Sequence, residues 1–215
     1  MAEVYMYVVA RDFGFAPNPF HGVCTLATCK PIIRRTAKVG DWVIGMGGSK
    51  LSAVGRCIFA MQITEAMSFD AYWAAPAYQA KRPVRNGSRK TIVGDNIYHR
   101  TVGSDHWQQE DSHHSQPDGT PDQYNIQNDT QTDRILISDH FWYFGNVAPI
   151  VPDDILNNLR FHNARGHRRY PLTNAQQLLS WLEEAFPNKI NHVLGDPFQF
   201  AKSSARYSKK SDQIM

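Results

Sequence analysis

The feature that most constrains the fold is the polar stretch 81–133, which shows almost no hydrophobic periodicity. Connections in compact domains usually span ~4–6 residues, so an irregular segment of this length either serves a function or lacks a fixed structure. The aromatic residues Tyr98, Trp107 and Tyr124 favour an ordered, functional segment. Its polar groups then need partners, which basic residues on the neighbouring regular elements can supply.

Regular elements flank this stretch on both sides. Runs rich in β-branched and aromatic residues predict strands over 4–10, 42–45, 53–64 and 134–138, with 141–145 as the continuation or partner of the last. Apolar residues spaced three and four apart predict helices over 68–78, 153–161 and 173–186. This mixture predicts an α+β domain. A chain of 215 residues suits one domain over 1–200, followed by a flexible basic tail over 201–215.

The composition of the chain indicates where in the cell it works. No stretch approaches the ~20 apolar residues that cross a bilayer, and the first residues lack the pattern of a secretory signal. The cysteines Cys24, Cys29 and Cys57 form an odd, sparse set, which suits a reducing compartment better than a disulfide framework. We therefore expect a cytoplasmic protein with reduced thiols and no membrane partner.

Charge is unevenly distributed, although the formal net charge is only +3. Between Thr101 and Asp133 there are seven acidic residues and no Lys or Arg, so a duplex phosphate backbone would be repelled there. The stretch from Arg165 to Arg169 is a compact basic cluster, read either as a solvated face or as a phosphate clamp. We expect it to contact a nucleic-acid backbone through Arg165, His167, Arg168 and Arg169.

Two groups of residues raise the question of a metal. Cys24 and Cys29 are five residues apart, which places them on opposite sides of a strand and apart on a helix, so they cannot easily converge on one ion. Packing is their ordinary role; the alternative is a nucleophilic thiol activated by Lys30 and Arg34. The histidines between His99 and His114 suit acid–base chemistry or a solvated loop, and they lack a metal-ligand spacing. We predict no metal, and the sequence identifies no cofactor.

Two resemblances narrow the fold and the function. The hairpin pattern at Val39–Val43, the run Val54–Ile63 and the helix start Ser68–Asp70 resemble the small barrels of the PUA, ASCH and EVE superfamily, which bind RNA or modified bases. The resemblance implies a bent, PUA-like β-barrel with a long ordered insertion and helices packed near the C-terminus.

A larger resemblance extends over about Tyr5 to His167. It is carried by Arg11–Phe20, Cys24–Pro31, Gly94–Tyr98, Asp129-Thr130 with Asp133-Arg134, and Phe141–Gly145. These blocks resemble the nucleotide modification associated domain, type 2. The resemblance implies a role in DNA base modification and does not name a reaction.

These patterns together predict a site that acts on or binds a nucleotide, with DNA as the favoured nucleic acid. We expect four acid–base residues to converge in one cleft with Lys30 or Arg34: Asp95, His99, His114 and Asp133. Carboxylates, amides and aromatics suit recognition of a neutral base, and the predicted substrate-binding residues are Phe15, Asn18, Phe20, Lys30, Arg34, Asn96, Tyr98, Asp129 and Arg134. The loop Phe15–Phe20, stiffened by two prolines, is expected to line the pocket.

Three functions fit the sequence. The first is an enzyme or accessory of base modification, the second a non-catalytic reader of modified nucleotides, and the third a module whose long loop docks a partner protein. Titratable groups that are buried together would favour the enzyme. An aromatic cage without a titratable pair would favour the reader, and an exposed apolar patch would favour the docking module.

Overall fold

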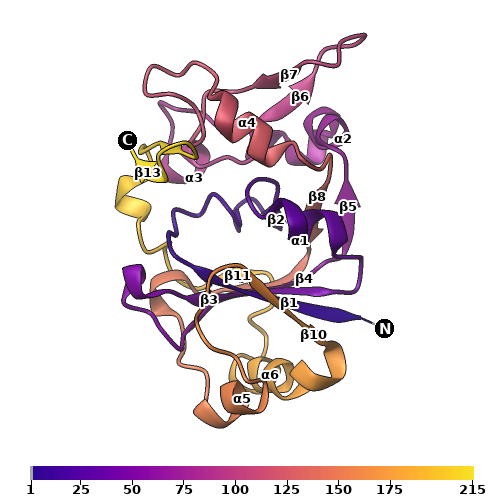
Figure 1. Ribbon diagram of the computed structural model, residues 1–215, viewed down its shortest axis with the longest axis vertical. Helices are drawn as coiled ribbons and strands as arrows, with labels where there is room; N and C mark the ends of the chain where they lie inside the picture. Colours follow the sequence, from indigo (N-terminus) through magenta and orange to yellow (C-terminus); the bar gives the residue numbers. More distant parts are fainter. Residues whose placement is uncertain (1) are drawn as a thin grey trace.

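A computed structural model describes residues 2–215 and is built around one mixed β-sheet (Figure 1). The sheet has the strand order β10-β1-β3-β4-β9-β11. Its strands are β1 (Glu3–Val9), β3 (Trp42–Gly47), β4 (Cys57–Gln62), β9 (His140–Tyr143), β10 (His167–Pro171) and β11 (His192–Val193). β1 runs parallel to β3 and antiparallel to β10, while β3 and β4 are antiparallel. The predicted strands at 4–10, 42–45 and 53–64 are confirmed.

The two faces of this sheet carry different layers (Figure 1). On one side lie α5 (Asp153–Asn158) and α6 (Leu172–Ala185), which confirm the helices predicted over 153–161 and 173–186. Leu178 and Leu182 of α6 are fully buried and belong to the main hydrophobic core. Apolar residues spaced by four lie on one face of a helix, so α6 covers the sheet with its apolar stripe.

The other side carries a second lobe with its own core, which includes Phe15, Phe69 and Tyr98. A three-stranded antiparallel sheet of order β2-β8-β5 connects it to the main sheet: β2 (Cys24–Leu26), β5 (Glu65–Met67) and β8 (Ile135–Ser138). β8 confirms the strand predicted over 134–138, but it does not pair with β9, which lies in the main sheet. The helices of the lobe are α1 (Pro31–Thr36), α2 (Phe69–Ala74), α3 (Arg89–Ile92) and α4 (Gln123–Asp129).

The polar stretch 81–133 folds within this second lobe. It contributes α3, α4 and a hairpin of β6 (Tyr98–Arg100) and β7 (Trp107–Gln109). Its first residue, Lys81, is fully buried and donates through Nζ to Asn18, Val23 and Thr25. The expectation that basic residues of neighbouring elements hold this stretch is met at Arg34, whose guanidinium donates to the carbonyl oxygen of Asp129.

Two expectations differ from the structure. Residues 2–215 form an α+β domain whose sheets stay open, with β10 and β11 at opposite edges of the main sheet, so the PUA-like barrel is not confirmed. Residues 201–215, expected to be a flexible tail, contain a hairpin of β12 (Tyr207–Ser208) and β13 (Gln213–Ile214) that packs on the second lobe. Phe200, stacked on Phe20, leads into it. In residues 2–215, no helix is both long and apolar enough to cross a membrane.

Candidate functional site

Cys29 lies on a tight turn between β2 and α1. The φ angles of Cys29 and Lys30 are 56° and 38°, which places two consecutive residues with side chains in the left-handed region. This conformation costs roughly 1–2 kcal/mol for each such residue. Pro31 then starts α1 with its φ already suited to a helix. A strained turn from strand to helix is one way in which enzymes present a nucleophile.

Three side chains from distant parts of the chain meet at this turn, and we call Cys29, His114 and Asp129 the Cys29 cluster. His114 Nε2 is 3.8 Å from Cys29 Sγ, and His114 Nδ1 is 2.7 Å from Asp129 Oδ2. His114 and Asp129 are buried, whereas Cys29 is partly exposed. Because Nδ1 is bonded to a carboxylate, Nε2 is the ring nitrogen that faces the thiol.

Asp129, the last residue of α4, holds the cluster together. Its Oδ1 accepts the backbone N–H of Cys29 at 2.8 Å, and its Oδ2 also accepts the Tyr98 hydroxyl at 3.0 Å. The guanidinium of the fully buried Arg34 donates to the carbonyl oxygens of Cys29 and Asp129. Arg34 therefore ties the turn to α4 through backbone groups and positions the cluster.

The charges of the cluster support one another. Burial opposes a charged imidazole, but the Asp129 carboxylate and the Cys29 thiol outweigh it and raise the pKa of His114 to about 10. Burial likewise opposes the Asp129 carboxylate, yet His114 and Arg34 lower its pKa below the usual value. The neighbouring His113 differs, because burial and the charge on His114 lower its pKa to about 3. His113 is therefore a neutral packing residue, and only His114 carries a proton toward Cys29.

The cluster also has the residue types of a metal site, since one ligand atom from each residue lies within 4.8 Å of the others. The hydrogen bonds argue for a different use. Both Asp129 oxygens and His114 Nδ1 are already engaged, which leaves His114 Nε2 and Cys29 Sγ facing each other. The three candidate ligands are the number that catalytic zinc takes from a protein, so the hydrogen bonds, and not the ligand count, argue against a metal. The arrangement fits proton transfer between thiol and imidazole better than metal binding.

The hairpin near the C-terminus packs directly on His114. The Tyr207 ring lies 5.6 Å from the His114 ring, and the Tyr207 N–H donates to the His113 carbonyl at 2.7 Å. The buried Asn125 amide joins the two segments, because its Nδ2 donates to the carbonyl oxygens of His114 and Tyr207, each at 2.7 Å. The hairpin and Asn125 thus orient the imidazole.

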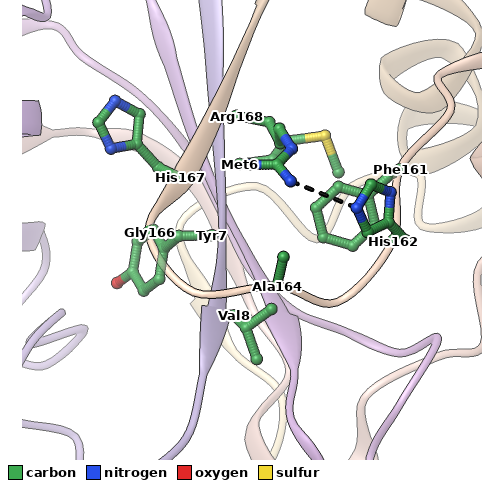
Figure 2. Close-up of a pocket in the computed structure, with 9 residues that line it drawn as sticks. All are labelled: Met6, Tyr7, Val8, Phe161, His162, Ala164, Gly166, His167 and Arg168. Carbon is green, nitrogen blue, oxygen red and sulfur yellow. Dashed lines mark hydrogen bonds between the residues drawn. The ribbon is translucent and has the colours of Figure 1, made fainter.

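Basic and aromatic residues of the main sheet border Cys29. Lys30 Nζ lies 4.2 Å from the centroid of the Tyr7 ring in β1, and Tyr7 is the register partner of His167 in β10. Side chains alternate along a strand, so His167 and Arg169 share the face of Tyr7, whereas Arg168 lies on the other face beside His162. Figure 2 shows His167 and Tyr7 on one side of the strands, with Arg168 and His162 on the other.

Several residues predicted for the site are brought together. His114, Asp129, Arg34, Lys30, Tyr98 and Phe15 all belong to the cluster or contact it, with the Phe15 ring 4.7 Å from the His114 ring. The loop Phe15–Phe20 is buried, and its role in lining a pocket stays a prediction. The compact clamp expected at Arg165–Arg169 is divided between two faces of a strand.

Other predicted residues have different partners. Asp95 accepts from Thr25 and Tyr72 in the buried network of Lys81 and Asn18. His99 pairs with Glu110 at 3.0 Å and stacks on Trp73, while Asp133 accepts the first backbone N–H of α2 and pairs with Arg100. Asn96 donates to the carbonyls of Tyr72 and Tyr78, Phe20 packs on Phe200, and Arg134 contributes its carbonyl to Arg34. Among the described residues, no hydrogen bond or ion pair joins Asp95, His99 or Asp133 to His114, so their expected convergence in one cleft stays a prediction.

The functional role of Cys29 was left open by the sequence. Its partners His114 and Asp129 lie 85 and 100 positions further along the chain, so no local spacing reveals the cluster. The available signal was Cys29 itself, followed by the basic residue Lys30 and by Pro31 at a strand-to-helix junction.

One comparison with known protein families identifies a match. The model of the family described as nucleotide modification associated domain 2 matches residues 1–204, which contain all three members of the Cys29 cluster. No curated protein and no solved structure matches the chain. With nearly its whole length matched, the chain belongs to the nucleotide modification associated domain 2 family.

Proposed function

We propose that this chain is a thiol-dependent enzyme that acts on a nucleotide or a DNA base. Cys29 is the nucleophile, His114 its acid–base partner and Asp129 the group that orients the imidazole. The observation that carries the proposal is the continuous line from Asp129 Oδ2 to His114 Nδ1 at 2.7 Å, and from His114 Nε2 to Cys29 Sγ at 3.8 Å. The family description supplies the substrate theme.

The chemistry follows from this line. With its pKa raised to about 10, His114 is an imidazolium near neutral pH and pairs with the thiolate of Cys29, which adds to an unsaturated carbon of the substrate while the π electrons move to the neighbouring substrate atom. Asp129 stabilises the imidazolium, whose Nε2 proton neutralises that substrate atom; the proton returns to Nε2 when the carbon–sulfur bond breaks and the thiolate is expelled. The apo distance of 3.8 Å is long for such a transfer, and catalytic contacts often tighten when substrate binds.

A reader of modified bases is the alternative that the sequence left open. A reader needs an aromatic cage and no titratable pair, whereas the residues around Cys29 include an imidazole and a carboxylate buried together. Burying two ionisable groups costs free energy of folding, so such a pair usually has a structural or catalytic role. Its contact with a partly exposed thiol favours the enzyme.

Alkylation by iodoacetamide tests the nucleophile directly. Cys24 and Cys57 are fully buried, and burial raises the pKa of each thiol to about 12, so the reagent reaches Cys29 alone in the folded protein. We expect the His114→Ala variant to react at least about tenfold more slowly near neutral pH, because the variant lacks the imidazolium that stabilises the reactive thiolate. The control is His99→Ala, whose imidazole pairs with Glu110 away from Cys29.

Mass spectrometry of nucleosides then tests the substrate theme. Cells that carry the wild-type chain with its native neighbouring genes should contain a modified nucleoside that cells with Cys29→Ser lack. Equal rates of alkylation for the wild-type protein and His114→Ala would refute the role of His114 in activating Cys29. Identical nucleoside profiles in both cell lines, in DNA and in the free nucleotide pool, would remove the proposed activity.

A further inference from the structure

We propose that Lys30, His167 and Tyr7 form a phosphate-binding subsite beside Cys29, so that the ligand of this site is a nucleotide carrying its phosphate. The inference deepens the proposed function and rests on it, because it names the substrate group that holds the reacting carbon near the thiol. Three observations support it: the placement of the cations, their lack of counter-charges, and a buried hydroxyl without a partner.

The cations come from two elements that meet at the turn of Cys29. Lys30 directly follows the cysteine, and its Nζ lies 4.2 Å from the centroid of the Tyr7 ring. His167 stands opposite Tyr7 in the β1–β10 ladder, and Arg169 lies two positions further on the same face. Figure 2 shows His167 and Tyr7 projecting from the same side of the strands. Lys30, which follows Cys29, is thus linked through Tyr7 to the donors of β10.

Lys30 and His167 have no acidic partner in the part of the chain that the structure describes. Arg169, by contrast, pairs with Glu3 at 3.4 Å. Burial lowers the pKa of Lys30, and Lys209 lowers it further against the opposing effect of Cys29. Burial also lowers the pKa of His167, as do Lys30 and Arg169. A bound anion would relieve this mutual repulsion and accept charge-assisted hydrogen bonds.

The Tyr7 hydroxyl is the third observation. Tyr7 is only 2% exposed, and its hydroxyl has no hydrogen-bond partner among the described residues. Buried hydroxyls nearly always have one, because leaving water without a new bond costs about 1–3 kcal/mol. Burial raises the pKa of Tyr7, and the nearby Cys29 raises it further, so the hydroxyl stays protonated as a donor. A phosphate or substrate oxygen at Cys29 would satisfy it.

The charges also orient the ligand. Cys29 contacts His114 of the segment 101–133, which contains seven acidic residues and no Lys or Arg. On the other side, Lys30 lies against Tyr7 of the main sheet. The phosphate is therefore held on the sheet side, and the uncharged base or sugar faces His114.

Protection of Cys29 from iodoacetamide tests the subsite. The probes are inorganic phosphate, deoxynucleoside 5′-monophosphates, the matching nucleosides and a single-stranded oligonucleotide, all at equal ionic strength. We expect phosphate and the monophosphates to slow alkylation and the nucleosides to act at least about tenfold more weakly. Lys30→Met should weaken protection roughly tenfold, as expected for one lost charge-assisted hydrogen bond. The matched control is Arg168→Met, one residue from His167 but on the opposite face.

Each outcome decides one statement. Protection by the monophosphates that is lost in Lys30→Met and kept in Arg168→Met supports the subsite; comparison with the oligonucleotide then shows whether the phosphate belongs to a free nucleotide or to a nucleic-acid chain. Equal protection by nucleosides and monophosphates, or equal effects of the two substitutions, would overturn it. This failure is distinct from that of the proposed function, because the effect of His114→Ala on alkylation is measured without any ligand.

Discussion

The ion pair of His114 and Asp129 should leave a measurable mark on stability as a function of pH. The pKa of His114 is raised from 6.5 to about 10 in the folded protein, against the opposing effect of burial. The folded state therefore holds a proton that the unfolded state releases between these values, so the stability from this pair is complete below about pH 6.5 and is lost as pH rises through about 10. At about 1.4 kcal/mol per pKa unit, the full effect is on the order of 5 kcal/mol.

Replacing Asp129 by Asn removes the charge that raises the pKa of His114. Burial then keeps the imidazole neutral. His114 should therefore no longer make the protein less stable as the pH rises. The fully buried Lys81 acts in the opposite sense, because burial lowers its pKa to about 8 and its contribution to stability recovers as pH rises toward 10.5. Lys81 is unchanged in the variant, so its effect cancels when the two proteins are compared.

Urea unfolding, monitored by tryptophan fluorescence, measures the free energy of unfolding of the wild-type protein and of Asp129→Asn at each pH. Between about pH 6.5 and pH 9.5, the free energy of unfolding of the wild-type protein should fall by several kcal/mol more than that of Asp129→Asn. Asp133→Asn serves as the control, since it is the same substitution on the same segment at a carboxylate that pairs with Arg100. Its free energy of unfolding should change with pH in parallel with that of the wild-type protein, lower by about 1 kcal/mol at most. Parallel curves for the wild-type protein and Asp129→Asn would refute the ion pair as described.

Three further predictions follow from the contacts. Lys81→Met should lower the free energy of unfolding by about 3–5 kcal/mol in urea titrations, because it leaves Asp95 uncompensated in the core. Adding Asp95→Asn should recover part of that loss; if the effects of the two substitutions simply add, the network is contradicted. Asp133→Asn should cost about 1 kcal/mol at most through the lost ion pair with Arg100, because Asn keeps an oxygen that accepts the Phe69 N–H, and Cys29 alkylation should stay unchanged; a large loss of alkylation would return Asp133 to the site. Asn125→Ala should slow Cys29 alkylation severalfold in mass-spectrometric assays, since the hairpin no longer holds His114; an unchanged rate would show that the hairpin does not position the imidazole.

Residues that are close in sequence were predicted well. The strands at 4–10 and 134–138 and the helix at 173–186 follow from periodicity, propensity and stop signals, which act over a few residues. The family resemblance covered the blocks that contain Cys29 and Asp129. The need for partners along 81–133 was also readable, because that stretch has many polar groups and few apolar residues to bury.

Partnerships between distant residues were decided by tertiary structure alone. Cys29 meets His114 and Asp129 only because β2 pairs with β8, which brings the turn after β2 against the end of α4. Asp95, equally acidic in sequence, is placed instead beside Lys81 in the core. The register of β10 against β1 likewise puts His167 beside Tyr7 and sends Arg168 to the other face. Composition determines which residues can do chemistry, but long-range strand pairing determines which of them meet, because each pairing is set by contacts that no local pattern contains.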